Sequence, residues 1–197
     1  QTARIWDAES AKIIATLKGH QSGVSSAAFD SKGKRVVTAS HDQTARIWDA
    51  ESAKTIATLK GHQSWVSSAA FDSKGKRVVT ASYDHTARIW DAESAEITAT
   101  LKGHQSTVLS AAFDYQGKRV ITASRDGSVR IWCAKSGECL EILVSIEGGW
   151  MSYQGEGDQY LWGGEGRKIL TFRDLEEQNT LPTLWQAEDW LPGEKVL

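Results

Sequence analysis

Short apolar runs separated by small polar residues recur along most of the chain. Runs of four to six residues, such as KIIATL, VSSAAF and RVVTAS, are rich in Val, Ile, Thr and aromatic residues and end at Gly, Ser or Asp. This pattern is typical of short antiparallel strands and leaves no room for a long helix. The sequence therefore predicts an all-β fold.

The pattern repeats with a period of 42 residues. Residues 1–42 and 43–84 differ at three positions, and residues 85–126 differ from 43–84 at ten. Each period contains four predicted strands, so each is one supersecondary unit that must pack against its neighbours to bury a core. The chain is therefore predicted to be a repeat architecture.

Two short motifs recur at fixed places in the repeat. A Gly-His pair is followed 28 residues later by a Trp in three copies, and Ile-Trp-Asp occurs at 5–7, 47–49 and 89–91. On these motifs, residues 1–144 resemble the WD40 repeat family. The resemblance implies a β-propeller, in which four-stranded antiparallel blades surround a central channel.

In this family the outermost strand of one blade precedes the inner three strands of the next along the sequence. A fourth copy of the repeat is degenerate, because Cys133 replaces the Asp of the motif and Ser145-Ile146 replaces Gly-His. The resemblance implies an outer half-blade at residues 1–17 and full blades at about 24–59, 66–101 and 108–144.

Residues 145–197 differ in character, with glycine turns and many aromatic residues. Three segments are predicted strands, and Pro182 places a fourth at an edge: Trp150–Gln154, Gln159–Trp162, Ile169–Arg173 and Leu181–Gln186. We interpret this part as an atypical C-terminal blade and tail. It is similar to the segment that follows WD40 arrays in large bacterial multidomain proteins, especially STAND and NACHT signalling NTPases.

Composition narrows the possible partners. The chain has 23 Lys and Arg against 25 Asp and Glu, a formal charge of −2, so it lacks the dense positive field of nucleic-acid and membrane-surface binders. Its apolar runs are too short for a transmembrane span.

Cys133 and Cys139 are too few for a disulfide framework, so we expect free thiols and a cytoplasmic location. The three Gly-Lys-Arg steps lack P-loop spacing and are interpreted as hairpin turns with exposed cations.

The resemblance assigns a buried hydrogen-bonded network to each blade. Buried imidazole, indole and carboxylate groups all need partners. The residues that occupy the family positions are His20, Thr38, Asp42 and Trp48, then His62, Thr80, Asp84 and Trp90, then His104, Thr122, Asp126 and Trp132. A Thr, a His and an Asp also resemble a catalytic triad, but three copies with a Trp as fourth member favour a structural role. We therefore predict no catalytic residue, no metal site and no cofactor.

Positions at which the near-identical repeats differ are the candidates for partner binding. The residue before the turn Asp is His41, Tyr83 or Arg125, and the third residue after Gly-His is Gly23, Trp65 or Thr107. At a third position Leu109 replaces a Ser. In WD40 blades these positions lie on the top face, and Trp, Tyr and Arg are enriched in interface hot spots. We predict one contiguous surface for a protein or peptide, formed by Trp65, Tyr83, Leu109 and Arg125 with His41 and Thr107. Neutral drift on a solvated rim is the alternative.

The sequence thus predicts a non-catalytic scaffold for protein–protein interaction, and its tail suggests the sensor part of a larger signalling protein. The alternative is an enzyme that uses acidic residues of the tail at the channel mouth: Glu156, Asp158 and Glu165. Because the repeats make fewer blades than WD40 propellers commonly have and the chain begins in mid-repeat, we expect missing upstream blades or self-association.

Overall fold

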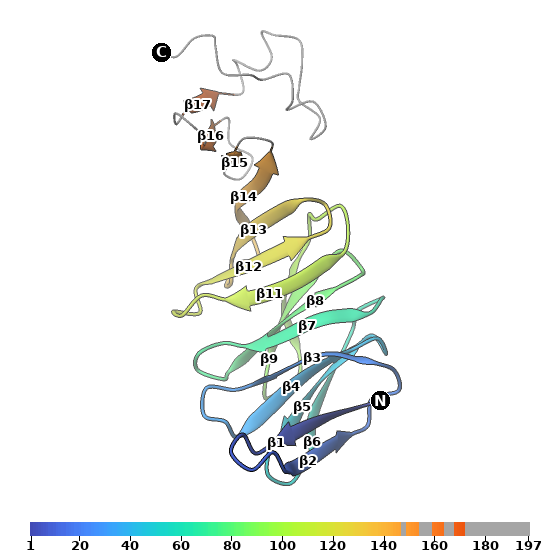
Figure 1. Ribbon diagram of the computed structural model, residues 1–197. Coiled ribbons are helices and arrows are strands. Elements are labelled where there is room, and N and C mark those ends of the chain that lie inside the picture. The colour runs from blue at the N-terminus through green and yellow to red at the C-terminus, as the bar shows by residue number, and fades with distance from the viewer. Residues whose placement is uncertain (147–148, 154–158, 164–167, 172–197) are drawn as a thin grey trace.

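The computed structural model describes residues 1–146, 149–153, 159–163 and 168–171. Every regular element in these residues is a β-strand, and the strands form sheets that follow one another along the molecule (Figure 1). No helix in the described residues could cross a membrane. The predicted all-β fold of four-stranded blades is confirmed, and the described blades form an open arc.

The first sheet is a two-stranded half-blade, β1 (Thr2–Trp6) and β2 (Ile13–Lys18). Blade 1 contains β3 (Val24–Phe29), β4 (Arg35–Ser40), β5 (Thr44–Asp49) and β6 (Thr55–Lys60). Blade 2 contains β7 (Val66–Phe71), β8 (Arg77–Ser82), β9 (Ala87–Asp91) and β10 (Ile97–Leu101). Blade 3 contains β11 (Val108–Phe113), β12 (Arg119–Ser124), β13 (Ser128–Cys133) and β14 (Cys139–Ile146).

Three further strands continue the sheet of blade 3. They are β15 (Gly149–Tyr153), β16 (Gln159–Gly163) and β17 (Lys168–Thr171), and β15 pairs antiparallel with β14. The structure therefore places them at the outer edge of blade 3 and in the same sheet. The division of the chain at residue 144 stays a prediction, and the fourth strand predicted at Leu181–Gln186 lies outside the described residues, as do Glu156, Asp158 and Glu165.

The hairpin between the first two strands of each blade owes its shape to a glycine. In blade 1 the N–H of Gly33 donates to the carbonyl oxygen of Asp30, and the N–H of Asp30 donates to that of Arg35. Gly33 has a φ of 67°, in the left-handed region that costs other residues energy. The tight turn therefore depends on glycine at this position.

The core lies between successive blades. We call the face of a blade that is turned to the next blade its forward face; in blade 1 it is formed by Val37, Ala39, Ala45, Ile47 and Leu59. These side chains pack against residues of blade 2 that include Val78, Trp90 and Ala92, on its backward face. Side chains alternate between the two faces along each strand, so one sequence pattern supplies both halves of the contact.

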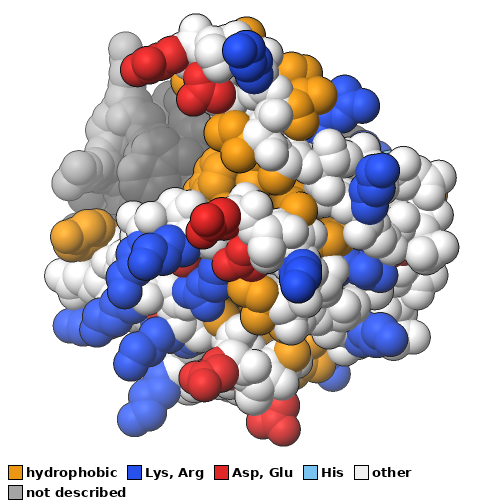
Figure 2. Space-filling view, turned by 90° about the horizontal axis from the view of Figure 1, so that it is seen from below, with side chains coloured by type: hydrophobic (Ala, Val, Ile, Leu, Met, Phe, Trp, Pro, Cys, Tyr) orange, Lys and Arg blue, Asp and Glu red, His pale blue; other side chains and the backbone are white. Residues whose placement is uncertain are grey.

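The end of the molecule that carries the half-blade is shown in Figure 2. Apolar side chains lie across the middle of this face, between basic and acidic ones. The exposed large apolar residues of the half-blade are Trp6, Ile13 and Ile14. These residues are exposed, whereas the forward face of blade 1 is buried against the sheet of blade 2.

Candidate functional site

The first predicted network joins four side chains of blade 1. His20 lies in the turn between β2 and β3, Thr38 on β4, Asp42 in the turn after β4, and Trp48 on β5. His20 Nε2 is 2.7 Å from Thr38 Oγ1, His20 Nδ1 is 2.8 Å from Asp42 Oδ2, and Trp48 Nε1 donates to Thr38 Oγ1 at 2.8 Å. The structure thus brings these four residues together.

Blades 2 and 3 repeat this geometry closely. In both, each of the two histidine contacts measures 2.7 Å and the Trp-to-Thr hydrogen bond measures 2.8 Å. The residues are His62, Thr80, Asp84 and Trp90 in blade 2, and His104, Thr122, Asp126 and Trp132 in blade 3. Ser128 adds a further contact of 3.3 Å to the ring of His104.

The donors and acceptors of the network fit a neutral imidazole. The indole N–H of Trp48 donates to the hydroxyl of Thr38, so this hydroxyl can donate its own proton to His20 Nε2. His20 Nδ1–H then donates to the carboxylate of Asp42. Burial lowers the pKa of His20 and of His104, although the aspartate partner of each acts to raise it. Both rings are therefore neutral at neutral pH.

The aspartate of the network holds two turns together. Burial alone would raise the pKa of Asp42, but hydrogen bonds from Thr44, Gln21 and His20 outweigh it and lower the pKa to about 2. Its Oδ1 accepts from the N–H and the hydroxyl of Thr44, and its Oδ2 accepts from the N–H of Gln21. The ionised carboxylate thus ties the turn before β3 to the turn after β4.

The same contacts have the distances of a hydroxyl, base and acid triad, yet their burial excludes that chemistry. Thr38 and Thr80 are fully buried and Thr122 is 1% exposed, so no substrate atom can reach the hydroxyl. The hydroxyl oxygen also accepts the indole N–H in every blade. The network therefore joins strands and turns within each blade. In the described residues no group of three His, Cys, Asp or Glu side chains could hold a metal ion.

A second set of contacts joins one blade to the next. The Ser25 hydroxyl of β3 donates to the carbonyl oxygen of Val66 on β7 at 2.6 Å, and Ser67 donates to Val108 O at the same distance. Leu109 occupies the corresponding position of blade 3 and has no hydroxyl to donate. Its side chain is exposed.

The arginine of the first hairpin in blades 1 and 2 also contacts the next blade. Arg35 Nε donates to Asp30 Oδ2 at 3.0 Å, its Nη2 donates to the carbonyl oxygen of Gly75, and its Cζ lies 5.0 Å from the centre of the Phe71 ring. Arg77 makes the same contacts with Asp72, Gly117 and Phe113. The interpretation of the Gly-Lys-Arg steps as exposed cations is therefore wrong for these two arginines, because each guanidinium reaches the next blade.

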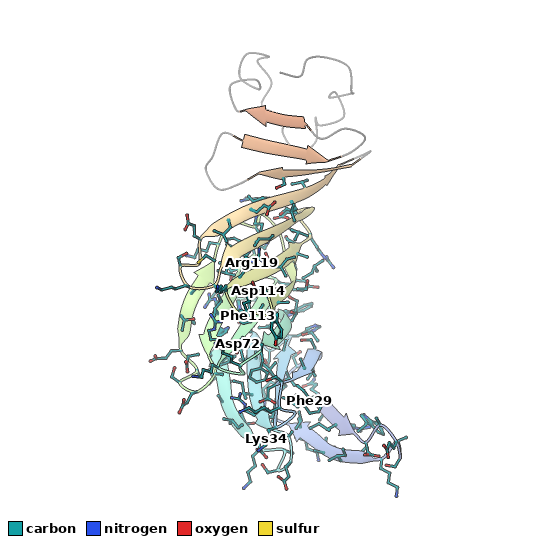
Figure 3. The ribbon with its side chains drawn as sticks, turned by 90° about the vertical axis from the view of Figure 1, so that its left-hand side faces the viewer. Phe29, Lys34, Asp72, Phe113, Asp114 and Arg119 are labelled. Carbon is teal, nitrogen blue, oxygen red and sulfur yellow. The ribbon has the colours of Figure 1, made fainter. Side chains whose placement is uncertain are left out.

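We call this series of contacts, in which the hairpin arginine of one blade lies over the Phe ring of the next, the arginine ladder. At each end of the ladder one residue lacks its partner. Figure 3 shows Phe113, Asp114 and Arg119 of blade 3 above Asp72 of blade 2, with Phe29 of blade 1 farther along the same side. Arg119 pairs with Asp114 at 3.1 Å, but 60% of its side chain is exposed. Phe29 is 52% exposed. In the described part of the chain, Arg119 thus has no Phe ring to lie over, and Phe29 has no guanidinium over its ring.

The candidate partner-binding residues form a continuous stack across three blades. The rings of His41 and Trp65 are parallel to within 7°, with their centres 4.3 Å apart. The Trp65 ring lies 5.4 Å from that of Tyr83, and Arg125 Cζ lies 5.7 Å from the centre of the Tyr83 ring. Four of the six candidate residues are thus in contact in the order His41, Trp65, Tyr83, Arg125.

The backbone explains why these positions meet. In blade 2 the N–H of Tyr83 donates to the carbonyl oxygen of Trp65 at 2.9 Å, just beyond the ends of β7 and β8. The same bond joins His41 to Gly23 and Arg125 to Thr107. The two positions at which the repeats differ are therefore neighbours in every blade. A large side chain at one position can contact the residue at the other position of its own blade and of the preceding blade.

The side chains of the two remaining candidates take no part in the stack, although the backbone of Thr107 is bonded to that of Arg125. Thr107 is buried, at 8% exposure, and offers little side-chain surface to a partner. Leu109 is exposed on β11 and makes none of the aromatic contacts of the stack. The ring and guanidinium contacts that define the stack therefore involve only the other four residues.

Three arginines that the sequence analysis passed over also belong to this end of the blades. They are Arg46, Arg88 and Arg130, one on the third strand of each blade. Their Nε atoms are buried and have no hydrogen-bond partner in the described part of the chain. A Cβ atom at Gly19 would lie 2.5 Å from Arg46 Nη1, the mobile end of that side chain, and 3.1 Å from the ring of the buried Trp48. The recurrence of Arg two residues before the motif Trp was the signal that could have found them.

The WD domain, G-beta repeat family matches residues 11–49, 53–91 and 95–133. These three segments make up more than half of the chain. The chain belongs to the WD40 family. The predicted WD40 repeats are confirmed for these three copies. No curated protein matches the sequence.

Membership of the WD40 family assigns this chain a general role. WD40 repeat domains are in general non-catalytic scaffolds that bind proteins or peptides. The buried network and the contacts between blades build the scaffold of this WD40 chain. The His41–Trp65–Tyr83–Arg125 stack lies on that scaffold at positions where the repeats differ.

Proposed function

We propose that this WD40 chain binds a protein or peptide segment along the stack of His41, Trp65, Tyr83 and Arg125. The observation that carries the proposal is that two of the three differences between the first two repeats, Gly23/Trp65 and His41/Tyr83, lie in a stack that crosses three blades. Neutral drift would place its substitutions without regard to contact.

The stack also favours a particular partner chemistry. Trp65 is 46% exposed and offers an apolar ring surface. Arg125 is exposed and forms no ion pair within the described part of the chain. A segment that places an apolar or aromatic side chain on Trp65 and a carboxylate at Arg125 would use both groups.

The wider role is proposed from the sequence. We propose that partner binding is the sensing step of a larger signalling protein, because residues 145–197 are similar to segments that follow WD40 arrays in such proteins. Cys133 and Cys139 are free thiols, which supports a cytoplasmic location.

A displayed peptide library would test the binding proposal. Peptides selected on the chain should bind the double variant Trp65→Gly, Tyr83→His at least about fivefold more weakly, since a hot-spot residue contributes about 1 kcal/mol or more. This variant copies Gly23 and His41 of the first repeat, so the blade should keep its fold. Arg125→Gln should weaken the acidic peptides selectively.

Variants on the opposite hairpins serve as controls. Lys76→Ala and Glu93→Ala lie in turns at the other end of the strands and should bind the selected peptides normally. If these variants lose binding, or if the double variant binds as tightly as the original chain, the stack is not the binding surface.

A further inference from the structure

The first hairpins of the three blades carry a series of lysines. These hairpins join β3 to β4, β7 to β8 and β11 to β12, and their sequences are DSKGKR twice and DYQGKR once. We call their exposed lysines the lysine row: Lys32, Lys34, Lys74, Lys76 and Lys118. Within the described part of the chain none of these lysines forms an ion pair.

The lysine row is a local excess of positive charge. The aspartate of each hairpin is already paired with the arginine of the same hairpin: Asp30 with Arg35, Asp72 with Arg77 and Asp114 with Arg119. These pairs are neutral in sum, so the five lysines leave the three hairpins with a net charge of +5. The whole chain has a formal charge of −2, so this positive region differs in sign from the chain as a whole.

Contacts between neighbouring hairpins hold the lysine row in place. The arginine ladder joins each hairpin to the next, and the Ser73 hydroxyl donates to the carbonyl oxygen of Tyr115 at 2.8 Å. Lys34, Asp72 and Asp114 follow one another along this side of the molecule (Figure 3). Stacked sheets lie about 10 Å apart, so three hairpins span about 20 Å, the length of about six extended residues. One short segment can therefore follow the whole row.

Acidic residues border the lysine row. In blade 1 the N–H of Ala50 donates to the carbonyl oxygen of Lys34 at 2.9 Å, and blade 2 has the equivalent bond. The next residues along the chain, Glu51 and Glu93, are exposed acids that lie beside the hairpins. An anionic membrane or a nucleic-acid duplex would bring negative charge against these acids, whereas a single polypeptide segment can stay within the row. The border therefore favours a polypeptide.

An aromatic side chain lies in the third hairpin, at one end of the lysine row. Tyr115 is 90% exposed and occupies the position that Ser31 and Ser73 have in the other two hairpins. Gln116 follows it, where the other two hairpins have lysine. Tyrosine is enriched in interface hot spots because its ring offers a large contact area with a polar tip. A partner that fits here has an apolar side chain next to its carboxylates.

We propose that the lysine row and Tyr115 bind an acidic polypeptide segment of a partner protein. Carboxylates of the segment pair with the ammonium groups, and an apolar side chain packs on the Tyr115 ring. This surface is separate from the stack, because the hairpin of blade 2 follows β7, whereas Trp65 precedes β7 and Tyr83 follows β8. The inference therefore does not depend on peptide binding at the stack.

Salt determines the conditions under which this contact is measured. The Debye length is about 8 Å at physiological ionic strength and about 30 Å at 0.01 M. Exposed ion pairs contribute little one by one, so the row acts through several charges together and mainly steers and orients an acidic partner. Lys76→Ala removes one of these charges, so it remains a control for peptides selected on the stack at physiological salt.

Fluorescence anisotropy of a labelled peptide at low salt tests the proposal. The probe has about six Glu residues followed by one Phe, which matches the length of the row. The original chain should bind this probe, and added salt should weaken the binding. The double variant Lys34→Glu, Lys76→Glu should bind it at least about tenfold more weakly, because two attractive charges become repulsive.

A matched control carries the same change in net charge at the other ends of the strands. Lys60 and Lys102 are exposed there, and Lys60→Glu, Lys102→Glu should bind the probe within about threefold of the original chain. The stack variant Trp65→Gly, Tyr83→His should bind the probe normally, so failure of the stack proposal leaves this test unaffected. Thermal melts check that every variant keeps its fold.

Two further variants use the third hairpin. Gln116→Lys restores the lysine of the other repeats and should tighten binding of the probe. Tyr115→Ser should weaken binding of the probe but not of a second peptide in which Ser replaces the Phe. The backbone bond from Ser73 to residue 115 does not need the tyrosine ring, so the hairpin should keep its shape.

The proposal is overturned if the original chain does not bind the probe, or if the control pair loses as much affinity as the Lys34, Lys76 pair. It is also overturned if Gln116→Lys does not tighten binding. Tighter binding of vesicles made of equal parts phosphatidylserine and phosphatidylcholine, or of a single-stranded oligonucleotide of the same charge, would contradict it as well, because the row would then serve a different class of partner.

Discussion

The guanidinium of Arg77 on blade 2 lies over the ring of Phe113 on blade 3, with Cζ 4.8 Å from the ring centre. The same side chain pairs with Asp72 in its own blade and donates to the carbonyl oxygen of Gly117 in the next. The first residue of β8 thus contacts both the hairpin of its own blade and the neighbouring blade.

We expect Arg77→Ala to lower the free energy of unfolding by roughly 1–3 kcal/mol, since it removes hydrogen bonds made by a charged group and leaves the buried Asp72 carboxylate without its cation. Arg119→Ala is the matched control at the same place in blade 3. Its exposed ion pair with Asp114 should contribute less than about 1 kcal/mol. Urea unfolding of the two variants measures both effects, and equal losses would show that the bridge between blades contributes nothing.

The network of blade 2 gives a second prediction. Thr80→Val keeps the shape of the side chain but leaves the indole N–H of Trp90 and Nε2 of His62 without a partner. We expect a loss of about 1–3 kcal/mol for these orphaned buried groups. Thr55→Val, an exposed change on β6, should leave the free energy of unfolding nearly unchanged. A Thr80 variant as stable as the original chain would mean that the hydroxyl is not the common partner of the two rings.

Local motifs account for what the sequence could predict. The spacing of Gly-His, Thr, Asp and Trp repeats three times, and each set lies within one blade, so position in the repeat was enough to name residues such as His62 and Asp84. The hydrogen bonds between blades join residues 40 or more positions apart, and nothing in the sequence says which side chain makes them. Arg35 and Gly75 are an example: the hairpin was predicted, but the reach of Arg35 to the next blade was not.

The stack of His41, Trp65, Tyr83 and Arg125 also contains contacts between blades that the sequence could not predict. The differing positions marked out Trp65 and Tyr83, and these two lie in one blade, joined by a backbone hydrogen bond. The parallel contact of His41 with Trp65 depends on the distance between blades, which the sequence does not contain. Leu109 was grouped with them by its substitution alone, and the structure places it on β11 with an exposed side chain.

A third prediction separates core tryptophans from surface ones. Trp90 is fully buried between blades 1 and 2, and Trp90→Ala should cost roughly 3–5 kcal/mol through lost burial and the cavity that remains. Trp65→Ala removes a ring that is nearly half exposed and should cost far less. Urea melts at equal protein concentration compare the two variants. Similar losses would contradict the assignment of Trp65 to a surface stack.

The last prediction concerns acid. The folded pKa values of His20 and His104 lie below the ordinary value of 6.5, so the unfolded chain binds protons at these residues more readily than the folded chain does. Their contribution to stability is therefore complete above pH 6.5 and is lost as the pH falls below it. Asp42 has a folded pKa of about 2 against 3.8 in the ordinary case, so its contribution is lost between these two values.

Thermal melts should therefore show a Tm that falls in two acid steps, the first beginning near pH 6.5 and the second below pH 3.8. The first step reports the network histidines only if the other histidines do not cause it. His41→Tyr and His85→Gln test this, because each introduces the residue that a neighbouring repeat has at the same position: Tyr83 and Gln43. Both variants should keep the first step unchanged. A Tm that stays constant or rises as the pH falls from 6.5 to about 5 would mean that the buried rings accept protons without cost, contrary to the neutral imidazole that the Trp, Thr and His hydrogen bonds require.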